Sequence, residues 1–355
     1  MRSGIIAGGN WIRDHVKVVE AWPQQDTLVT ILSQRSGNGG SPYNILINLA
    51  HLGAKFPLCA VGLVGADDDG SAILKDCAEH RIDTTQLQQT PDAATSYTDV
   101  MTVGTTGRRT FFHQRGANSK LAGRHFDFTG SQKKIFHLGY LLLLETLDQV
   151  VEGLPNACDV LRRAREAGLM TSLDCVSEDS DRFREIVLPV LPLVDILFAN
   201  DFEAEKTTGI VLRVDGVLSA AAVQLAGCKL IAAGVRSWAV IHFPEGVFAC
   251  NASGEGLWQP SLKVEPSAIV GAVGAGDALA AGVLYGLHED WPMAESRSLR
   301  MQSCGKAESW AASSRAASSA PPLGARRLAR PMSWASCAST GRPVRIMSMA
   351  RDAPM

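Results

Sequence analysis

The sequence predicts an α/β protein with a doubly wound, mostly parallel sheet flanked by helices and a small antiparallel β lid. Short apolar runs alternate with segments whose apolar residues recur every three or four positions, which is typical of βαβ units. Two segments, 16–36 and 95–114, fit no such unit, and the second is rich in Thr, Val, Tyr and Phe. We expect them to form antiparallel hairpins that cover a cleft, although an extension of the edge of the main sheet fits the pattern nearly as well.

The expected strands are short and apolar, as strands buried on both faces should be. They are Gly4–Ala7, Leu58–Gly62, Lys134–Leu138, Leu169–Leu173, Ile196–Ala199, Leu230–Ala233 and Ala239–His242. The expected helices between them are Tyr43–Leu52, Ser71–His80, Asn156–Ala167, Asp201–Thr208 and Gly216–Leu225. Ligands of such a sheet bind beyond the carboxyl ends of its strands.

Composition is that of a globular protein with a sizeable core. The 355 residues are 46% hydrophobic and carry a formal net charge of −2, which gives no reason to expect a nucleic-acid partner. The apolar run 138–144 is far shorter than the ~20 residues of a membrane span, and we expect no membrane partner. Eight scattered cysteines without a C-x-x-C pair favour free thiols, so a cytoplasmic location is expected.

The last sixty residues differ from the rest of the chain. Residues 296–355 contain nine Arg and one Lys against Glu308 and Asp352, with twelve Ser and twelve Ala and no Phe or Tyr. Such a composition builds few strands and little core. We therefore divide the chain into a domain of residues 1–295 and an atypical tail of residues 296–355, for which disorder or translation in a shifted frame is our hypothesis.

The strongest local signal is the turn Gly274-Ala275-Gly276-Asp277, which runs directly into an Ala- and Leu-rich helix. Small residues let the backbone approach a ligand, and the first amides of a helix form an anion site. A carboxylate beside that site is suited to taking the proton from a hydroxyl that attacks a phosphoryl group. An acid that merely complements the helix dipole is the alternative interpretation of Asp277.

This turn resembles the D-[TS]-x-G-A-G-D signature of the ribokinase (PfkB) carbohydrate kinases. The resemblance implies that Asp277 is the catalytic base, that residues 274–276 form an anion hole, and that ATP and Mg²⁺ are used. Gly271-Ala272 stands where the family has its Asp-Thr pair. Dependence on a monovalent cation is therefore not implied for this chain.

A second segment, from Gly37 to Gly53, resembles the G-G-x-x-x-N motif and helix with which the family binds sugar hydroxyls. Gly39, Gly40 and Asn44 match its positions, and Asp14 follows the first strand, where the family has a sugar-binding Asp. The resemblance implies that all four bind the sugar. A glycine-rich loop before a helix and an exposed acid remain the alternatives.

Asn200 and Glu203 resemble the N-x-x-E motif, which implies that Glu203 holds Mg²⁺ through water while Asn200 helps to position the phosphates. The alternative is a capping box at the start of a helix, which needs no metal. Gly246 is the residue that remains of the family's nucleotide-binding T-x-G-x-x-G.

Arg109, Arg115 and Asn118 lie within or just after the second lid segment, and a guanidinium there could grip the substrate. Solvated hairpin charges are the alternative for both arginines. His137 and Asp174 end expected strands on the ligand side, where each fits a pocket-lining role as well as a core role.

We therefore expect an ATP-dependent kinase that moves the γ-phosphoryl group of MgATP to a hydroxyl of a small sugar, with a homodimer through the lid as its expected assembly. A non-catalytic sugar- or nucleotide-binding protein and a nucleoside kinase are the alternatives.

Overall fold

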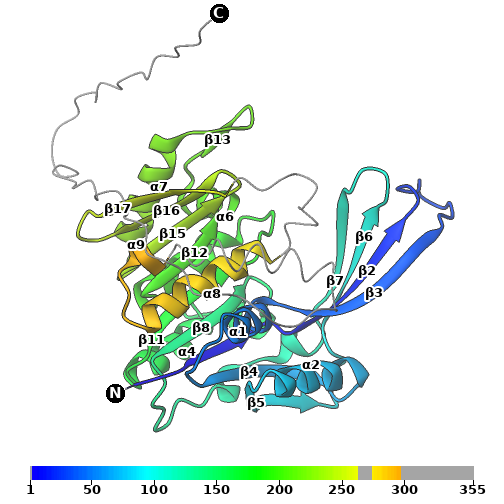
Figure 1. Cartoon of the computed structure of the whole chain (residues 1–355), viewed down its shortest axis with the longest axis horizontal. Coiled ribbons are helices and arrows are strands. Elements are labelled where there is room, and N and C mark those ends of the chain that lie inside the picture. Colours follow the sequence, from blue (N-terminus) through cyan, green and yellow to red (C-terminus); the bar gives the residue numbers. More distant parts are fainter. Residues whose placement is uncertain (1, 263–273, 297–355) are drawn as a thin grey trace, which may run out of the picture.

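The computed structural model describes residues 2–262 and 274–296, and a nine-stranded sheet forms the middle layer of this part (Figure 1). From one edge to the other its strands are β17 (Gly256–Pro260), β16 (Gly246–Asn251), β15 (Trp238–Phe243), β12 (Ile196–Asn200), β11 (Met170–Cys175), β8 (Ile135–Leu141), β1 (Ile5–Gly9), β4 (Leu58–Gly65) and β5 (Asp83–Thr90). The pairs from β15 to β5 are parallel, and β16 and β17 add an antiparallel edge. The predicted mostly parallel sheet is confirmed.

Helices cover both faces of this sheet. α1 (Ser41–His51), α2 (Asp68–Glu79) and α8 (Ala275–His288) share one apolar core with α9 (Met293–Ser296). α4 (Ala157–Glu166), α6 (Asp201–Thr208) and α7 (Ala220–Ala232) bury their apolar sides in a second core.

The strands feed the two cores alternately, because successive side chains of a strand point to opposite faces. In β12, Ile196 and Phe198 join the core of α1 and α8, whereas Leu197 and Ala199 join the core of α4 and α7. This burial on both faces explains why the strands are short and almost wholly apolar, and it confirms the doubly wound arrangement.

Short elements connect the larger ones. The helical turns are η1 (Gly116–Lys120), η2 (Gly123–His125), α3 (Glu145–Asp148), η3 (Phe183–Val187), α5 (Leu188–Val190) and η4 (Leu191–Leu193). The small hairpins pair β9 (Val150–Val151) with β10 (Leu154–Pro155) and β13 (Arg213–Val214) with β14 (Val217–Leu218).

The lid is a separate four-stranded sheet that projects from the body of the domain (Figure 1). Its order is β3 (Ile31–Gly39), β2 (Ile12–Val19), β6 (Tyr97–Val103) and β7 (Arg109–Gln114). Both hairpins are antiparallel, as predicted, and they join through a parallel pairing of β2 with β6. The extension of the main sheet is thereby excluded, and the first hairpin is longer than the predicted 16–36.

Two predicted elements are wrong. Leu230–Ala233 is not a strand but the end of α7, and the predicted helix Gly216–Leu225 starts only at Ala220, after Ser219 has capped it. A short apolar run does not distinguish a strand from a buried helical segment by its period, which explains the first error.

None of the six cysteines in the described part forms a disulfide. No helix in the same part has the length and apolar character to cross a membrane. The predicted tail, from Arg297 onward, and the Gly271-Ala272 pair lie outside the described residues.

Candidate active site

Asp277 lies in the first turn of α8, where the carboxyl ends of the parallel strands meet. Gly274 precedes this turn with a φ of +81°, in the left-handed region that glycine adopts without strain. A Cβ atom on Gly276 would lie 3.0 Å from Cε1 of His242, so the turn packs against the end of β15. The glycines of 274–276 thus let the start of the helix approach the sheet closely.

Two side chains from distant parts of the chain donate to Asp277. Asn44 Nδ2 donates to Asp277 Oδ2 at 2.7 Å, and the Tyr140 hydroxyl donates to the same oxygen at 3.1 Å. Asn44 comes from α1, and Tyr140 lies near the end of β8. The carboxylate is only 4% exposed and is therefore held in one orientation.

Burial raises the pKa of Asp277, and the neighbouring charge of Asp174 raises this pKa further, while the bonds from Asn44 and Tyr140 lower it. A carboxylate with a raised pKa is a stronger base than an exposed one. The arrangement suits Asp277 to accept a proton from a hydroxyl near neutral pH.

Asp14 faces this site from the base of the lid, in β2. Its side chain hydrogen bonds with Thr98 of β6, and its carboxylate lies over Gly39, because a Cβ atom there would be 2.3 Å from Asp14 Oδ2. Burial raises the pKa of Asp14 to about 6, and its charge contributes to the raised pKa of Asp277. Asp14 is a strand residue, not the loop acid of the alternative interpretation.

Gly40 connects the lid to α1 with a φ of +90°, and a Cβ atom there would lie 1.9 Å from the carbonyl oxygen of Asn10. Only glycine fits this position. Gly39, Gly40 and Asn44, which the sequence singled out, therefore lie between Asp14 and Asp277.

Asn200 and Glu203 form the capping box of α6. Asn200 Oδ1 accepts from the backbone amide of Glu203 at 2.8 Å, and the backbone amide of Asn200 donates to Glu203 Oε2 at 3.0 Å. Ser177 Oγ donates to Glu203 Oε1 at 2.7 Å. The capping box, which was the alternative interpretation of this motif, is thus present. It does not explain why the pKa of Glu203 is raised.

Glu203 is 6% exposed, and burial raises its pKa to about 8, with further raising by the charges of Asp174 and Asp277. A cation between these carboxylates would stabilise their charged forms. No group of three His, Cys, Asp or Glu side chains arranged to hold a metal occurs among residues 2–262 and 274–296. Magnesium is usually held by one carboxylate, water and phosphate, and Glu203 supplies one such carboxylate at the start of α6.

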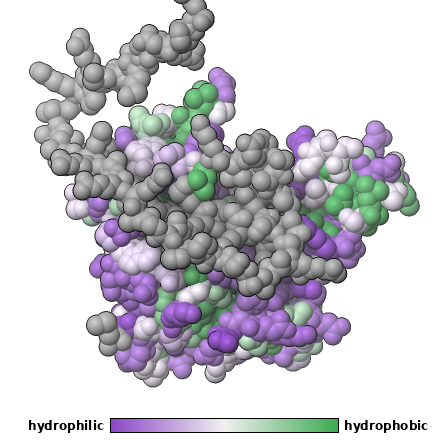
Figure 2. Space-filling view, viewed as in Figure 1, coloured by the Kyte–Doolittle hydropathy of each residue, from purple (hydrophilic) through white to green (hydrophobic). Residues whose placement is uncertain are grey.

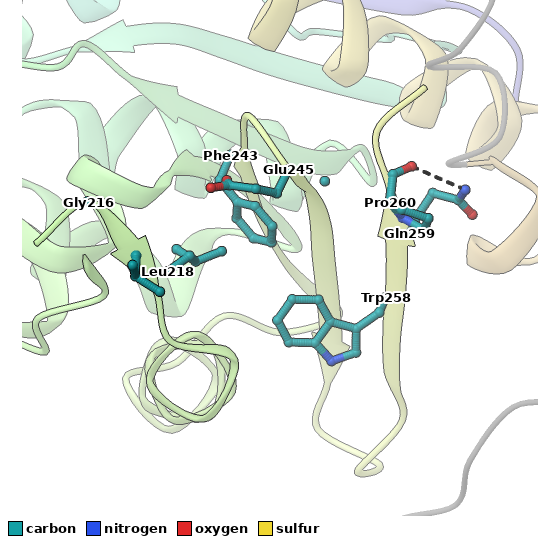
Figure 3. A pocket seen from close by; sticks show the side chains of 9 residues that line it. Gly216, Leu218, Phe243, Glu245, Trp258, Gln259 and Pro260 are labelled. Carbon is teal, nitrogen blue, oxygen red and sulfur yellow. Dashed lines mark hydrogen bonds between the residues drawn. The ribbon is translucent and has the colours of Figure 1, made fainter. Parts of the chain in front are cut away.

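Gly246 lines a cavity of about 550 Å³ beyond the end of β15 (Figure 3). Phe243, Trp258 and Leu218 supply apolar surface, and the rings of Phe243 and Trp258 have centroids 5.9 Å apart. Glu245, at the same cavity, forms two hydrogen bonds with Arg213. The cavity is large enough for a flat heteroaromatic ring.

Three predicted site residues are not brought to Asp277. Asp14 pairs with Thr98 of β6, and Arg109 pairs with Thr102, four positions further along the same strand. Arg109 therefore lies about 13 Å along the lid from the level of Asp14. Arg115 lies near Asp148: burial raises the pKa of this carboxyl to about 6, and the charges of Arg182 and Arg115 oppose that rise.

Asn118 is fully buried, and its side chain is occupied within the protein. Nδ2 donates to Asn10 Oδ1 at 2.7 Å and to the Trp11 carbonyl at 2.8 Å, while Oδ1 accepts from the Trp11 amide at 3.2 Å. It anchors the segment between β1 and the lid and has no remaining hydrogen for a substrate.

Two residues of the site were not among the predicted ones. Tyr140 adopts a φ of +57°, which no sequence pattern signalled, and this turn directs its hydroxyl to Asp277. Asp174 is the last residue but one of β11, and its position near a strand end was the one available signal.

The model of the pfkB family of carbohydrate kinases matches residues 5–299, which is most of the chain. The chain belongs to the pfkB family. The match ends close to residue 295, where the composition changes.

Among curated proteins, a probable chloroplastic fructokinase-6 of Arabidopsis thaliana is 28% identical over 262 residues. The match covers 71% of this chain and 62% of that protein, so the chain spans less than two thirds of its length.

Two solved structures have the same fold. A ribokinase from Thermotoga maritima superposes with a TM-score of 0.67 at 18% identity, over 83% of this chain and 89% of its own. An Arabidopsis thaliana ribokinase complexed with ribose and ATP gives a TM-score of 0.67 at 17% identity, over 85% and 91% of the two chains.

Proposed function

We propose that this pfkB protein is a sugar kinase that transfers the γ-phosphoryl group of ATP to a hydroxyl of a small carbohydrate. The observation that supports this most directly is the buried carboxylate of Asp277, whose pKa is raised and whose Oδ2 is held by Asn44 and Tyr140. It lies at the start of a helix, where the amides of the first turn attract anions.

In the proposed reaction the sugar lies between the lid and α8. Asp14 accepts hydrogen bonds from sugar hydroxyls, and the absence of a Cβ atom at Gly39 leaves the Asp14 carboxylate in its place. Asn44 orients Asp277, which takes the proton from the attacking hydroxyl. Positioning and proton acceptance are the contributions that phosphoryl transfer needs from side chains.

The phosphates lie, in this proposal, across the first turn of α8, with Gly274, Ala275 and Gly276 as the anion hole. Glu203, at the start of α6, holds Mg²⁺ through water, and Asn200 keeps Glu203 in place. Bound Mg²⁺ would neutralise charge on the phosphates and on the buried carboxylates. The adenine would occupy the cavity of Phe243, Gly246 and Trp258 (Figure 3).

An ADP-release assay with a panel of sugars, sugar acids and nucleosides tests the proposal. The names of the relatives make fructose and ribose the first acceptors to try. Turnover with a sugar supports it, and turnover with nucleosides alone would make the protein a nucleoside kinase. Sugar binding by calorimetry without ATP binding would instead indicate a non-catalytic protein.

We also propose a homodimer through the lid. Trp22, Ile31, Leu32, Phe111 and Phe112 are each about half exposed, and hydrophobic side chains gather on the lid in Figure 2. Trp22 stacks on Phe112, so the two hairpins share one apolar surface. Exposed apolar patches of this kind mark interaction sites.

Sedimentation of the wild type and of a Leu32→Lys variant tests this assembly. A dimer that dissociates in the variant supports it, whereas a wild-type monomer at high protein concentration would exclude it.

A further inference from the structure

Asp174 is a buried carboxylate that the proposed reaction does not yet use. It is the last residue but one of β11, is 7% exposed, and accepts two short hydrogen bonds. Ser41 Oγ donates to its Oδ2 at 2.6 Å, and the backbone amide of Tyr140 donates to its Oδ1 at 2.7 Å. One side chain thus joins two segments that are about a hundred residues apart in the sequence.

The first of these segments leads to Asn44. Ser41 is the first residue of α1, fully buried, and its hydroxyl also lies 3.0 Å from His137 Nε2. Asn44 is one turn further along the same rigid helix, so fixing Ser41 fixes where the Asn44 amide points. That amide donates to Asp277.

The second segment is Tyr140 itself. Its φ of +57° is uncommon for a residue with a bulky side chain and is adopted at a conformational cost. The hydrogen bond from its amide to Asp174 holds this conformation. The conformation in turn brings the Tyr140 hydroxyl to Asp277.

Both donors to Asp277 therefore depend on the same carboxylate. Resting on the proposed function, we propose that Asp174 is the positioning residue of the active site, which fixes Asn44 and Tyr140 so that together they orient the base Asp277. Asp174 acts through these two residues, and no contact of its own with the sugar is needed.

Several ionisable groups face Asp277 from the elements packed around it. Asp174 and Tyr140 approach from the sheet, Asp14 from the lid and Glu203 from α6, and His242 lies beside the turn at Gly276. The charge of Asp174 is the strongest of the neighbouring charges that raise the pKa of Asp277. Removing that charge without changing the shape of residue 174 should therefore lower this pKa.

Two substitutions separate charge from anchoring. Asp174→Asn keeps an oxygen for the Tyr140 amide but loses the charge, so the acid limb of kcat/KM should move to lower pH by roughly 1 unit while most activity is kept. Asp174→Ala loses both hydrogen bonds, so kcat should fall at least about tenfold while KM for ATP is unchanged.

Asp195→Asn is the matched control. Asp195 accepts from the Thr171 amide at 2.8 Å, near the opposite end of the same strand. The Asp195→Asn substitution should lower stability without moving the acid limb of kcat/KM, because Asp195 is remote from Asp277. An unshifted acid limb in Asp174→Asn, or a wild-type kcat in Asp174→Ala, would overturn the proposal.

A measurement without turnover separates this proposal from the proposed function. At pH 8, Asp277→Asn should raise Tm more in the wild type than in the Asp174→Asn background, because part of the repulsion is already gone in the latter. An equal rise of Tm in both backgrounds would show that the two carboxylates are not coupled. That result would contradict the proposal for Asp174 even if the protein were an active kinase. A coupled pair in a protein that phosphorylates no substrate would refute the proposed function alone.

Discussion

Asn44 Nδ2 donates to Asp277 Oδ2 at 2.7 Å and so joins α1 to α8 across 233 positions of the sequence. The two helices lie side by side on one face of the sheet (Figure 1) and share a core. The segment that resembles a sugar-binding motif and the one that resembles a catalytic motif thus meet in a single hydrogen bond.

Replacing Asp277 by Asn should abolish phosphorylation but retain sugar binding. The amide cannot accept the proton, so kcat should fall by about 10²-fold or more. Because burial and Asp174 raise the pKa of Asp277, the loss of its charge should also raise Tm at pH 8. Steady-state kinetics, calorimetry with sugar and thermal melts check the three parts.

Asp290→Asn is the control for that variant, since Asp290 lies just beyond the other end of α8 and pairs with Lys134 at the surface. Its kinetics should match the wild type. Normal turnover by Asp277→Asn would remove Asp277 from the role of base.

Replacing Gly39 by Ala should weaken sugar binding. The new methyl group would lie 2.3 Å from Asp14 Oδ2 and push that carboxylate from its place. We expect KM for the sugar to rise about tenfold or more, with KM for ATP unchanged. Gly37→Ala, on the same strand but with nothing within 4 Å of its Cβ atom, should leave both constants unchanged. Equal effects of the two substitutions would contradict the placement of Asp14.

The pKa of Glu203 predicts a pH dependence of stability. Its carboxyl has a pKa of about 8 in the folded protein against 4.5 for an ordinary glutamate. The folded state therefore holds this proton more tightly than the unfolded state, and the contribution of Glu203 to stability falls as pH rises from about 4.5 to 8. Thermal melts of the wild type and Glu203→Gln should show a weaker decline in the variant.

The same variant should need more magnesium for half-maximal activity if Glu203 holds the ion. Glu205→Gln, on the same helix, is the control and should have the wild-type decline and magnesium requirement. If Glu203→Gln had the magnesium requirement of the wild type, Glu203 would be left with its capping role alone.

Asn118→Ala should lower stability rather than sugar affinity. The substitution leaves the buried Trp11 amide and Asn10 Oδ1 without this partner, which costs about 3 kcal/mol. Chemical denaturation should show this loss, while KM for the sugar stays within about twofold at a temperature where the variant is folded. Ser119→Ala, one residue further on, should cost less. A large rise in KM without loss of stability would restore Asn118 as a sugar ligand.

The sequence predicted most of the body of the fold because buried parallel strands are short and apolar and its helices are periodic. It did not predict the end of α7, since Leu230–Ala233 is apolar throughout and carries no period. Asp14, Asn44 and Asp277 could be found because each lies in a short local motif, and the structure brings them together. Tyr140 could not, since its role depends on an uncommon φ and on a hydrogen bond to Asp174. Arg109 and Asn118 were chosen for residue type and for their place within or just after the lid segment, which says nothing about the reach of a side chain or about partners already present.

The parallel pairing of β2 with β6 makes the two lid hairpins one mechanical unit, and Asp14 belongs to it while Asp277 belongs to the body. Any rotation of the lid therefore changes the separation of these two carboxylates without altering the interior of either part. If the sugar binds between Asp14 and Asp277, as we propose, the angle of the lid sets the width of its site, so substitutions where β3 joins α1 should select among sugars of different size.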